Sequence, residues 1–384
     1  MRRDGIIVLC AGAALGFVLG SVHAFSVFLT PLEARFGAPR ADVSLSYSLA
    51  LVSITLAVSL GHRLYALVPA WMLAVVIGVL GIAGVMLARS ADSLGLVWLG
   101  YGVIFGTANG LGYGFGLQMS AQANPGREGL AMGLITAAYA LGATVFPVWF
   151  ERALDAGGFS EAMVLLAMSI AAASAMAAIL LAAARARFVA AARTEGGAGA
   201  GDTIVLWLAY GAAVAAGLMA TGHATGIAAE GGLPPEMLVA APVAIAVCNM
   251  AGSLGGGTLA DRVAPGPLLT GLPLVSALAL GLLALDWMPD VLIGLGLIGL
   301  VYGAVISVYP AVIARRFGVA VGVHVYGRVF SAWAVAGLGG PWIAGWIFDT
   351  TGGYGTALWI AAGLACASAA IAFVRLRGQR APGP

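Results

Sequence analysis

The chain alternates between long apolar runs and short polar segments along its whole length. Each run has about 20 residues or more, which is enough for a helix to cross a hydrocarbon core of roughly 30 Å. The runs lack the period-two alternation of half-buried strands, and backbone polar groups in lipid must be satisfied within the segment. The pattern therefore predicts helices. The expected spans are residues 5–32, 43–61, 70–89, 93–120, 129–150, 160–184, 203–227, 236–260, 266–285, 290–314, 323–348 and 354–376.

Composition agrees with a lipid environment. Hydrophobic residues make up 61% of the chain and charged residues 9%, against about 25% charged residues in soluble domains. We expect an all-α membrane protein with twelve transmembrane helices. No G-x-x-x-x-G-K-[ST] phosphate loop is present, which excludes ATP-driven transport by this chain alone.

The arginines predict the orientation. An excess of basic residues marks the cytoplasmic loops of a membrane protein. With the N-terminus inside, alternate loops are rich and poor in Arg, so both termini are expected to be cytoplasmic and the membrane to be the inner membrane. The expected cytoplasmic segments carry Arg2, Arg3, Arg63, Arg127, Arg185, Arg187, Arg193, Arg262, Arg315, Arg316, Arg375, Arg377 and Arg380, and the external loops carry Arg35, Arg40, Arg89 and Arg152.

Short sequences recur at separations of 194 to 201 residues, always in corresponding spans. The pairs are His23-Ala24 with His223-Ala224, Gly61-x-x-Leu64 with Gly256-x-x-Leu259, Tyr101-Gly102 with Tyr302-Gly303, and Pro147-x7-Asp155 with Pro341-x7-Asp349. Parallel repeats of this kind are typical of transporters that bind solute between two halves near the bilayer midplane. We expect an N-terminal six-helix bundle (1–185), a cytoplasmic linker (186–202) and a C-terminal six-helix bundle (203–384), related by pseudo-symmetry.

A cytoplasmic motif supports a family resemblance. Residues 257–262 read Gly-Thr-Leu-Ala-Asp-Arg between the eighth and ninth spans. This resembles the G-x-L-a-D-R signature of the major facilitator superfamily (MFS), which implies a gating role for Gly257, Asp261 and Arg262. The corresponding first-half sequence, which begins at Gly61, has no acidic residue.

Within that superfamily, the chain is most similar to the monocarboxylate and oxalate–formate branch. The similarity is carried by residues 25–32 with Phe36-Gly37, by Tyr326-Gly327-Arg328 through Gly340-Pro341, and by residues 349–354. Two departures concern charge: Ser253 and Trp333 stand where the branch has an arginine and a lysine. The resemblance therefore implies a small organic acid as solute, but not a dianion such as oxalate.

Deep ionisable groups are costly in a bilayer and are usually functional. His23 and His223 lie in matching places in the first and seventh spans. Each could contact the solute and couple transport to protons, since imidazole titrates near neutral pH. Alternatively, each could only pack, with His223 bonded to a hydroxyl such as Thr221 or Thr225. Arg328 could meet a leaving anion, or extend to the headgroups or to a salt bridge.

Neutral polar and aromatic residues complete the expected solute site. Such residues line many small-molecule sites, although aromatic side chains in helices often only pack and amides often join helices. The candidates are Asn109, Tyr139, Asn249, Tyr302 and Trp333. No cysteine lies at metal-ligand spacing, and we expect no metal and no cofactor.

We expect a secondary active transporter rather than an enzyme, with a small-molecule substrate, a proton as coupling ion, the lipid bilayer as environment and no nucleic-acid partner. The expected solute is a monocarboxylate and the expected oligomeric state is a monomer. One alternative is an exporter of neutral or lipophilic compounds, which the missing cations would suit. Another is a membrane sensor or scaffold, against which the lack of a sizeable soluble domain argues.

Overall fold

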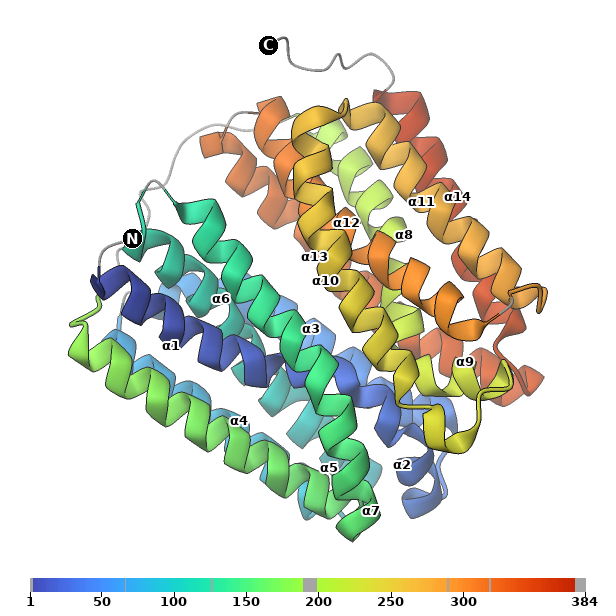
Figure 1. Ribbon diagram of the computed structural model, residues 1–384, viewed down its shortest axis with the longest axis horizontal. Coiled ribbons are helices and arrows are strands. Elements are labelled where there is room, and N and C mark those ends of the chain that lie inside the picture. The colour runs from blue at the N-terminus through green and yellow to red at the C-terminus, as the bar shows by residue number, and fades with distance from the viewer. Residues whose placement is uncertain are drawn as a thin grey trace. The chain divides into compact units, whose positions relative to one another are not determined.

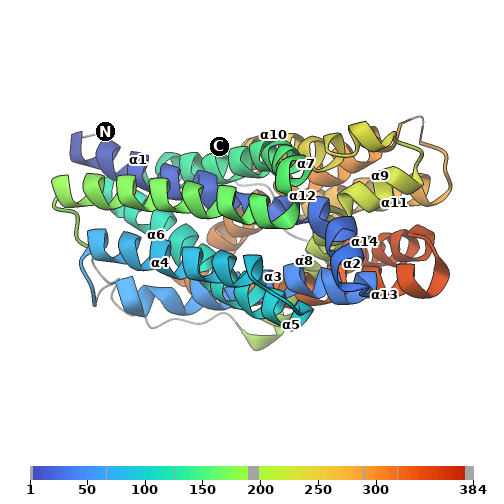
Figure 2. The same ribbon diagram turned by 90° about the horizontal axis from the view of Figure 1, so that it is seen from below.

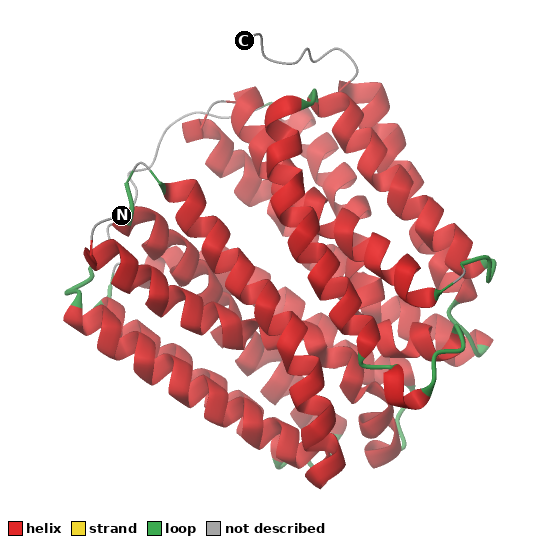
Figure 3. Cartoon of the chain, viewed as in Figure 1, coloured by secondary structure: helices red, strands yellow, loops and turns green. Residues whose placement is uncertain are grey.

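The computed structural model describes residues 3–65, 67–125, 127–188, 199–288, 290–317 and 319–376, and their regular structure is helical throughout (Figures 1 and 3). The chain divides into two compact units, Met1–Ala192 and Arg193–Pro384. The expected linker 186–202 falls largely on residues 189–198, outside the described part. Each unit is an all-helical bundle.

The described residues of the first bundle form nine helical segments. They are α1 (Arg3–Leu19), the 3₁₀ helix η1 (Gly20–Phe28), α2 (Leu29–Phe36), α3 (Arg40–Tyr65), α4 (Ala70–Arg89), α5 (Leu94–Val97), the π-helix η2 (Trp98–Phe105), α6 (Gly106–Ala123) and α7 (Glu128–Ala183). The predicted spans 5–32 and 93–120 are thus each built from three consecutive segments. Span 70–89 coincides with α4.

The second bundle follows the same plan. Its segments are α8 (Ala200–Gly222), α9 (Ala224–Glu230), the short 3₁₀ helix η3 (Pro235–Met237), α10 (Ala240–Arg262), α11 (Pro265–Ala284), α12 (Val291–Phe317), α13 (Val319–Thr351) and α14 (Gly355–Leu376).

The described residues contain ten helices that are long and apolar enough to cross a membrane. One of them lies within α7 and holds two spans, because Gly157 and Gly158 interrupt it with non-helical backbone angles. Gly158 has φ of 68°, a left-handed conformation that glycine adopts without strain. The 33-residue α13 is a further long helix. The prediction of twelve helices in two six-helix bundles is confirmed.

Glycine allows the same pair of helices to pack closely in each bundle. In the first, a Cβ atom on Gly106 would lie 2.8 Å from the Cα atom of Ala50 in α3. In the second, a Cβ atom on Gly303 of α12 would overlap the backbone oxygen of Asn249 in α10. Small residues permit such contacts between membrane helices.

The first helix of each bundle changes its course at or near its histidine. In the first bundle, α1 ends at Leu19 and the chain continues as the 3₁₀ helix that contains His23. In the second, His223 separates α8 from α9 with φ of −122° and ψ of 19°. The two histidines, which match in the sequence repeat, therefore both lie where the backbone leaves a regular α-helix.

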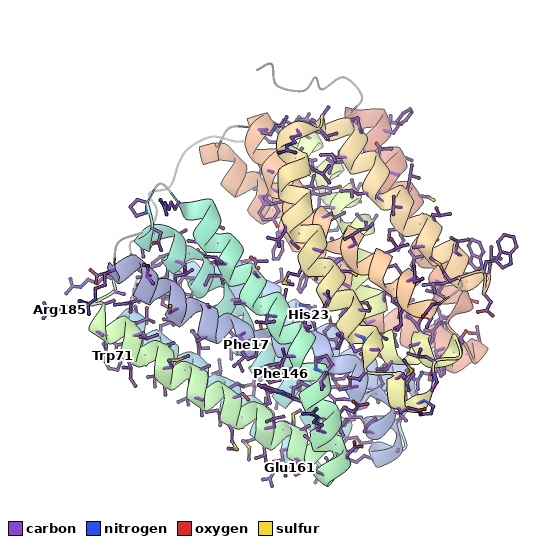
Figure 4. All side chains as sticks on the ribbon, in the orientation of Figure 1. Phe17, His23, Trp71, Phe146, Glu161 and Arg185 are labelled. Atoms are coloured by element: carbon purple, nitrogen blue, oxygen red, sulfur yellow. The ribbon has the colours of Figure 1, made fainter. Side chains whose placement is uncertain are left out.

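The interrupted first helix packs tightly on α7. Figures 1 and 2 show α1 beside both arms of that helix, and Phe17 lies 5.6 Å from Phe146, ring centre to ring centre (Figure 4). A Cβ atom on Gly20 would overlap the carbonyl oxygen of Tyr139, and one on Gly142 would overlap that of Phe17. The two backbones thus touch next to His23.

We predict that Gly142→Ala destabilises the protein, because the added methyl group must separate two backbones. Overpacking of this kind costs about 1–3 kcal/mol. Thermal unfolding in detergent should show a lower midpoint for the variant. Gly133→Ala, in the same helix but with open space around the new methyl group, is the matched control and should not lower the midpoint. An unchanged midpoint for Gly142→Ala would contradict the close contact.

Candidate functional site

At Leu19 the chain passes from α1 into the 3₁₀ helix η1, and Asn109 bonds the backbone at this transition. Its Nδ2 atom donates to the carbonyl oxygen of Leu19 at 2.6 Å. Its Oδ1 atom accepts a hydrogen bond from the hydroxyl of Tyr139 at 3.1 Å. Asn109 is fully buried, so this amide joins α1, α6 and α7 at the break.

His23 lies one turn beyond this junction. Its Nδ1 atom is 2.7 Å from the hydroxyl oxygen of Tyr47 in α3. The ring of Tyr139 meets the imidazole edge to face, at 5.6 Å between centres and 76° between planes. His23 is half-buried, and the described residues provide no hydrogen-bond partner for its Nε2 atom. One nitrogen is therefore fixed and the other can meet a ligand.

Tyr113 extends the aromatic surface. Tyr113 of α6 packs against Tyr139 at 4.7 Å between ring centres, and its hydroxyl lies 3.4 Å from Oγ1 of Thr136. We call His23, Tyr47, Asn109, Tyr113 and Tyr139 the His23 cluster. It combines phenols and an amide with one imidazole, which can be neutral or carry one positive charge. It could hold a small solute by stacking and by a few directed hydrogen bonds.

In the second bundle, Tyr302 and Trp333 come together. The Nε1–H group of Trp333 donates to the hydroxyl oxygen of Tyr302 at 2.8 Å, and both side chains are buried. Phe330 stacks on Trp333 at 5.8 Å between ring centres. The bond joins α12 to α13, as the Tyr139–Asn109 bond joins the corresponding helices α6 and α7.

His223 has a different environment from His23. It is fully buried, and its Nε2–H group donates to the carbonyl oxygen of Pro341 at 2.7 Å. Its Nδ1 atom lies 2.8 Å from the hydroxyl of Tyr354. Thr221 donates instead to the carbonyl oxygen of Gly217. Both nitrogens of His223 thus contact neutral protein groups, which favours the packing interpretation for this histidine.

The remaining predicted site residues lie elsewhere in the second bundle. Oδ1 of Asn249 accepts a hydrogen bond from Ser253 at 3.3 Å, within the contact between α10 and α12. Arg328 is exposed, and its carbonyl oxygen accepts a hydrogen bond from Ser331 at 2.6 Å.

The predicted gating motif ends α10, where Arg262 is exposed. For Gly257 and Asp261 the structure describes only the helical backbone. Next to them, the guanidinium of Arg315 donates to the carbonyl oxygen of Ala260.

Sequence reasoning missed several polar contacts. Arg315 caps the end of α10, and Arg316 of α12 pairs with Asp202 of α8 at 2.9 Å. In the first bundle, Tyr47 was not identified although it holds His23. These partners are 24 to 114 residues apart in sequence, so no local pattern connects them. In the described residues, no group of three or more His, Cys, Asp or Glu side chains could hold a metal ion.

Comparison with known proteins supports the resemblance at the level of the fold. No family model matches the sequence. A curated relative, the uncharacterized MFS-type transporter YhjX of Escherichia coli (strain K12), is 27% identical over 164 residues. That match covers 43% of this chain and 41% of the relative, so the chain spans about two fifths of the relative's length in the alignment.

A solved structure matches over nearly the whole chain. It is the MFS transporter FucP in the outward conformation, with 17% sequence identity and a TM-score of 0.62. The match covers 97% of this chain and 99% of the FucP chain. The chain therefore has the fold of an MFS transporter.

We predict that Asn109→Ala lowers the stability of the protein, because it removes two buried hydrogen bonds, to the carbonyl oxygen of Leu19 and from the hydroxyl of Tyr139. Such a loss costs about 1–3 kcal/mol. The unfolding midpoint in detergent should fall more for Asn109→Ala than for Asn249→Ala, whose amide is half-buried and makes a longer bond. Equal midpoints for the two variants would show that Asn109 does not stabilise the break.

Proposed function

We propose that this protein is an MFS secondary transporter that moves a small monocarboxylate across the inner membrane by alternating access, coupled to protons. The observation that carries the proposal is the MFS fold, which covers 97% of the chain. The half-buried His23, with one nitrogen available to a ligand, adds a candidate site within that fold. The positions of the arginines support cytoplasmic termini.

The chemistry of the His23 cluster supports a monocarboxylate. A neutral imidazole donates one hydrogen bond from Nε2, and a protonated imidazole adds a single positive charge. One charge suits one carboxylate, and the rings of Tyr113 and Tyr139 suit an apolar or aromatic body. Ser253 and Trp333 stand where the monocarboxylate and oxalate–formate branch has an arginine and a lysine. The loss of these two cations argues against a dianion.

Proton coupling would use the same group. The Asp and Glu residues of the described helices lie toward helix ends or near the kink of α7, so His23 is the group in the cluster that can take up a proton. A proton taken up on the acidic side would favour binding of the anion, and its loss on the other side would favour release. Solute and proton would then cross in the same direction.

A second candidate function is export of neutral or lipophilic compounds. The observation that favours it is the aromatic, largely uncharged character of the His23 cluster. Such a surface also accepts planar apolar molecules by stacking. The two candidates differ in their solute and in the direction of the proton gradient that drives transport.

We predict gradient-driven uptake of a monocarboxylate by the purified protein in proteoliposomes. A panel of radiolabelled monocarboxylates would be offered with and without an acidic exterior. At least one should accumulate only when the gradient is present. His23→Gln removes the titrating group but keeps a polar side chain, and should reduce uptake to the level of protein-free liposomes.

His223→Gln is the matched comparison. It should lower the unfolding temperature, because Pro341 and Tyr354 lose their partner, but gradient-dependent uptake should remain. Uptake that survives in His23→Gln would remove His23 from the coupling step. Failure of every acid, together with gradient-driven movement of a lipophilic dye, would favour the exporter instead.

A further inference from the structure

Tyr47 is rigidly held next to His23. Its side chain is fully buried, and its ring stacks on Phe25 at 5.7 Å between centres with an angle of 8° between planes. Phe25 in turn packs against Tyr101 at 5.4 Å. The phenol hydroxyl therefore occupies a fixed point in the bundle, 2.7 Å from Nδ1 of His23.

We propose that Tyr47 is a positioning residue that donates its O–H to Nδ1 of His23 and thereby presents the Nε2–H group to the carboxylate of the solute. This inference rests on the proposed function and names the hydrogen-bond geometry of its site. Tyr47 would act through His23 and would not itself touch the solute.

The donor and acceptor inventory supports this direction. A neutral imidazole carries one N–H group, and the partner of the other nitrogen decides which nitrogen carries it. If Tyr47 donates to Nδ1, the proton must lie on Nε2, the nitrogen without a partner in the described residues. Had Nδ1 carried the proton, Nε2 would be an acceptor and would repel a carboxylate.

The same phenol also tolerates a protonated imidazole. When His23 gains a second proton, Nδ1–H can donate to the phenol oxygen of Tyr47, which is an acceptor as well as a donor. Nε2–H keeps its direction in both states. The contrast is His223, whose Nε2–H group is already used by the carbonyl oxygen of Pro341.

Among the residues whose side chains the structure describes, no charged group competes with Tyr47 at the imidazole. The rings that contact His23 are those of Tyr47 from α3 and Tyr139 from α7, both uncharged phenols. The charged residues of the neighbouring segments α2, α3 and α7 lie toward the ends of those helices or at the kink of α7. Those described with their side chains are Glu33, Arg35, Arg40, Asp42, Glu151, Arg152, Asp155 and Glu161.

The test compares the imidazole nitrogens of His23 in the wild type and in Tyr47→Phe, which keeps the stacked ring. The full-length protein, labelled with ¹⁵N-histidine, would be studied by NMR in lipid nanodiscs, with His23 assigned by the loss of its signals in His23→Gln. The wild type should show protonated Nε2 and hydrogen-bonded, unprotonated Nδ1, and Tyr47→Phe should show a mixture of tautomers. The control is Tyr101→Phe, whose hydroxyl lies 3.5 Å from the carbonyl oxygen of Val22, and it should resemble the wild type.

Uptake kinetics provide the second readout. Tyr47→Phe should raise KM for the carried acid about tenfold with little change in the maximal rate, since one hydrogen bond that orients the ligand contact is lost. Binding of the acid to the otherwise wild-type protein, measured by isothermal calorimetry, should weaken by the same factor in Tyr47→Phe and stay unchanged in Tyr101→Phe.

An unchanged tautomer of His23 in Tyr47→Phe overturns the inference, whatever the transport result. An affinity for the acid that is unchanged in Tyr47→Phe overturns it too, because Tyr47 would then not present the Nε2–H group to the solute. If the wild type carries no acid, the proposed function fails, and the NMR comparison still decides whether Tyr47 sets the tautomer.

Discussion

A broken helix in a membrane needs partners for its backbone, and this requirement organises both bundles. Hydrocarbon offers no hydrogen bonds, so each carbonyl that leaves the helical ladder must be met by protein. At the end of α1 the partner of Leu19 is the amide of Asn109. In the second bundle His223, which lies at the break between α8 and α9, donates a hydrogen bond to the carbonyl oxygen of Pro341 in α13. In both bundles a buried polar side chain therefore forms a hydrogen bond with the backbone near the break.

The repeated histidine has different hydrogen-bond partners in the two halves. In the first bundle the amide of Asn109 bonds the carbonyl oxygen of Leu19 at the end of α1, and His23 keeps one nitrogen for a ligand. In the second bundle the histidine itself satisfies a carbonyl group, and Tyr354 occupies its other nitrogen. A sequence repeat therefore preserves the position of a residue without preserving its role. This difference is why the proposed coupling site lies on His23 alone.

The sequence predicts the helices well because length and hydropathy are enough to identify a membrane span. Span 70–89 coincides with α4, and the glycine pair at 157–158 separates two spans as the charge pattern requires. The site is predicted less completely. The contact between His23 and Tyr47 depends on which face of α3 meets the first helix, and an apolar run rich in serine does not reveal that face.

The most direct test of the account is ligand-dependent thermal stability of the purified protein. Small monocarboxylates and bulky neutral compounds would be compared on the wild type, His23→Gln and His223→Gln. The account predicts that a monocarboxylate raises the unfolding temperature of the wild type and of His223→Gln but not of His23→Gln. Stabilisation of His23→Gln by the same acid, or stabilisation of the wild type by lipophilic compounds only, would contradict it.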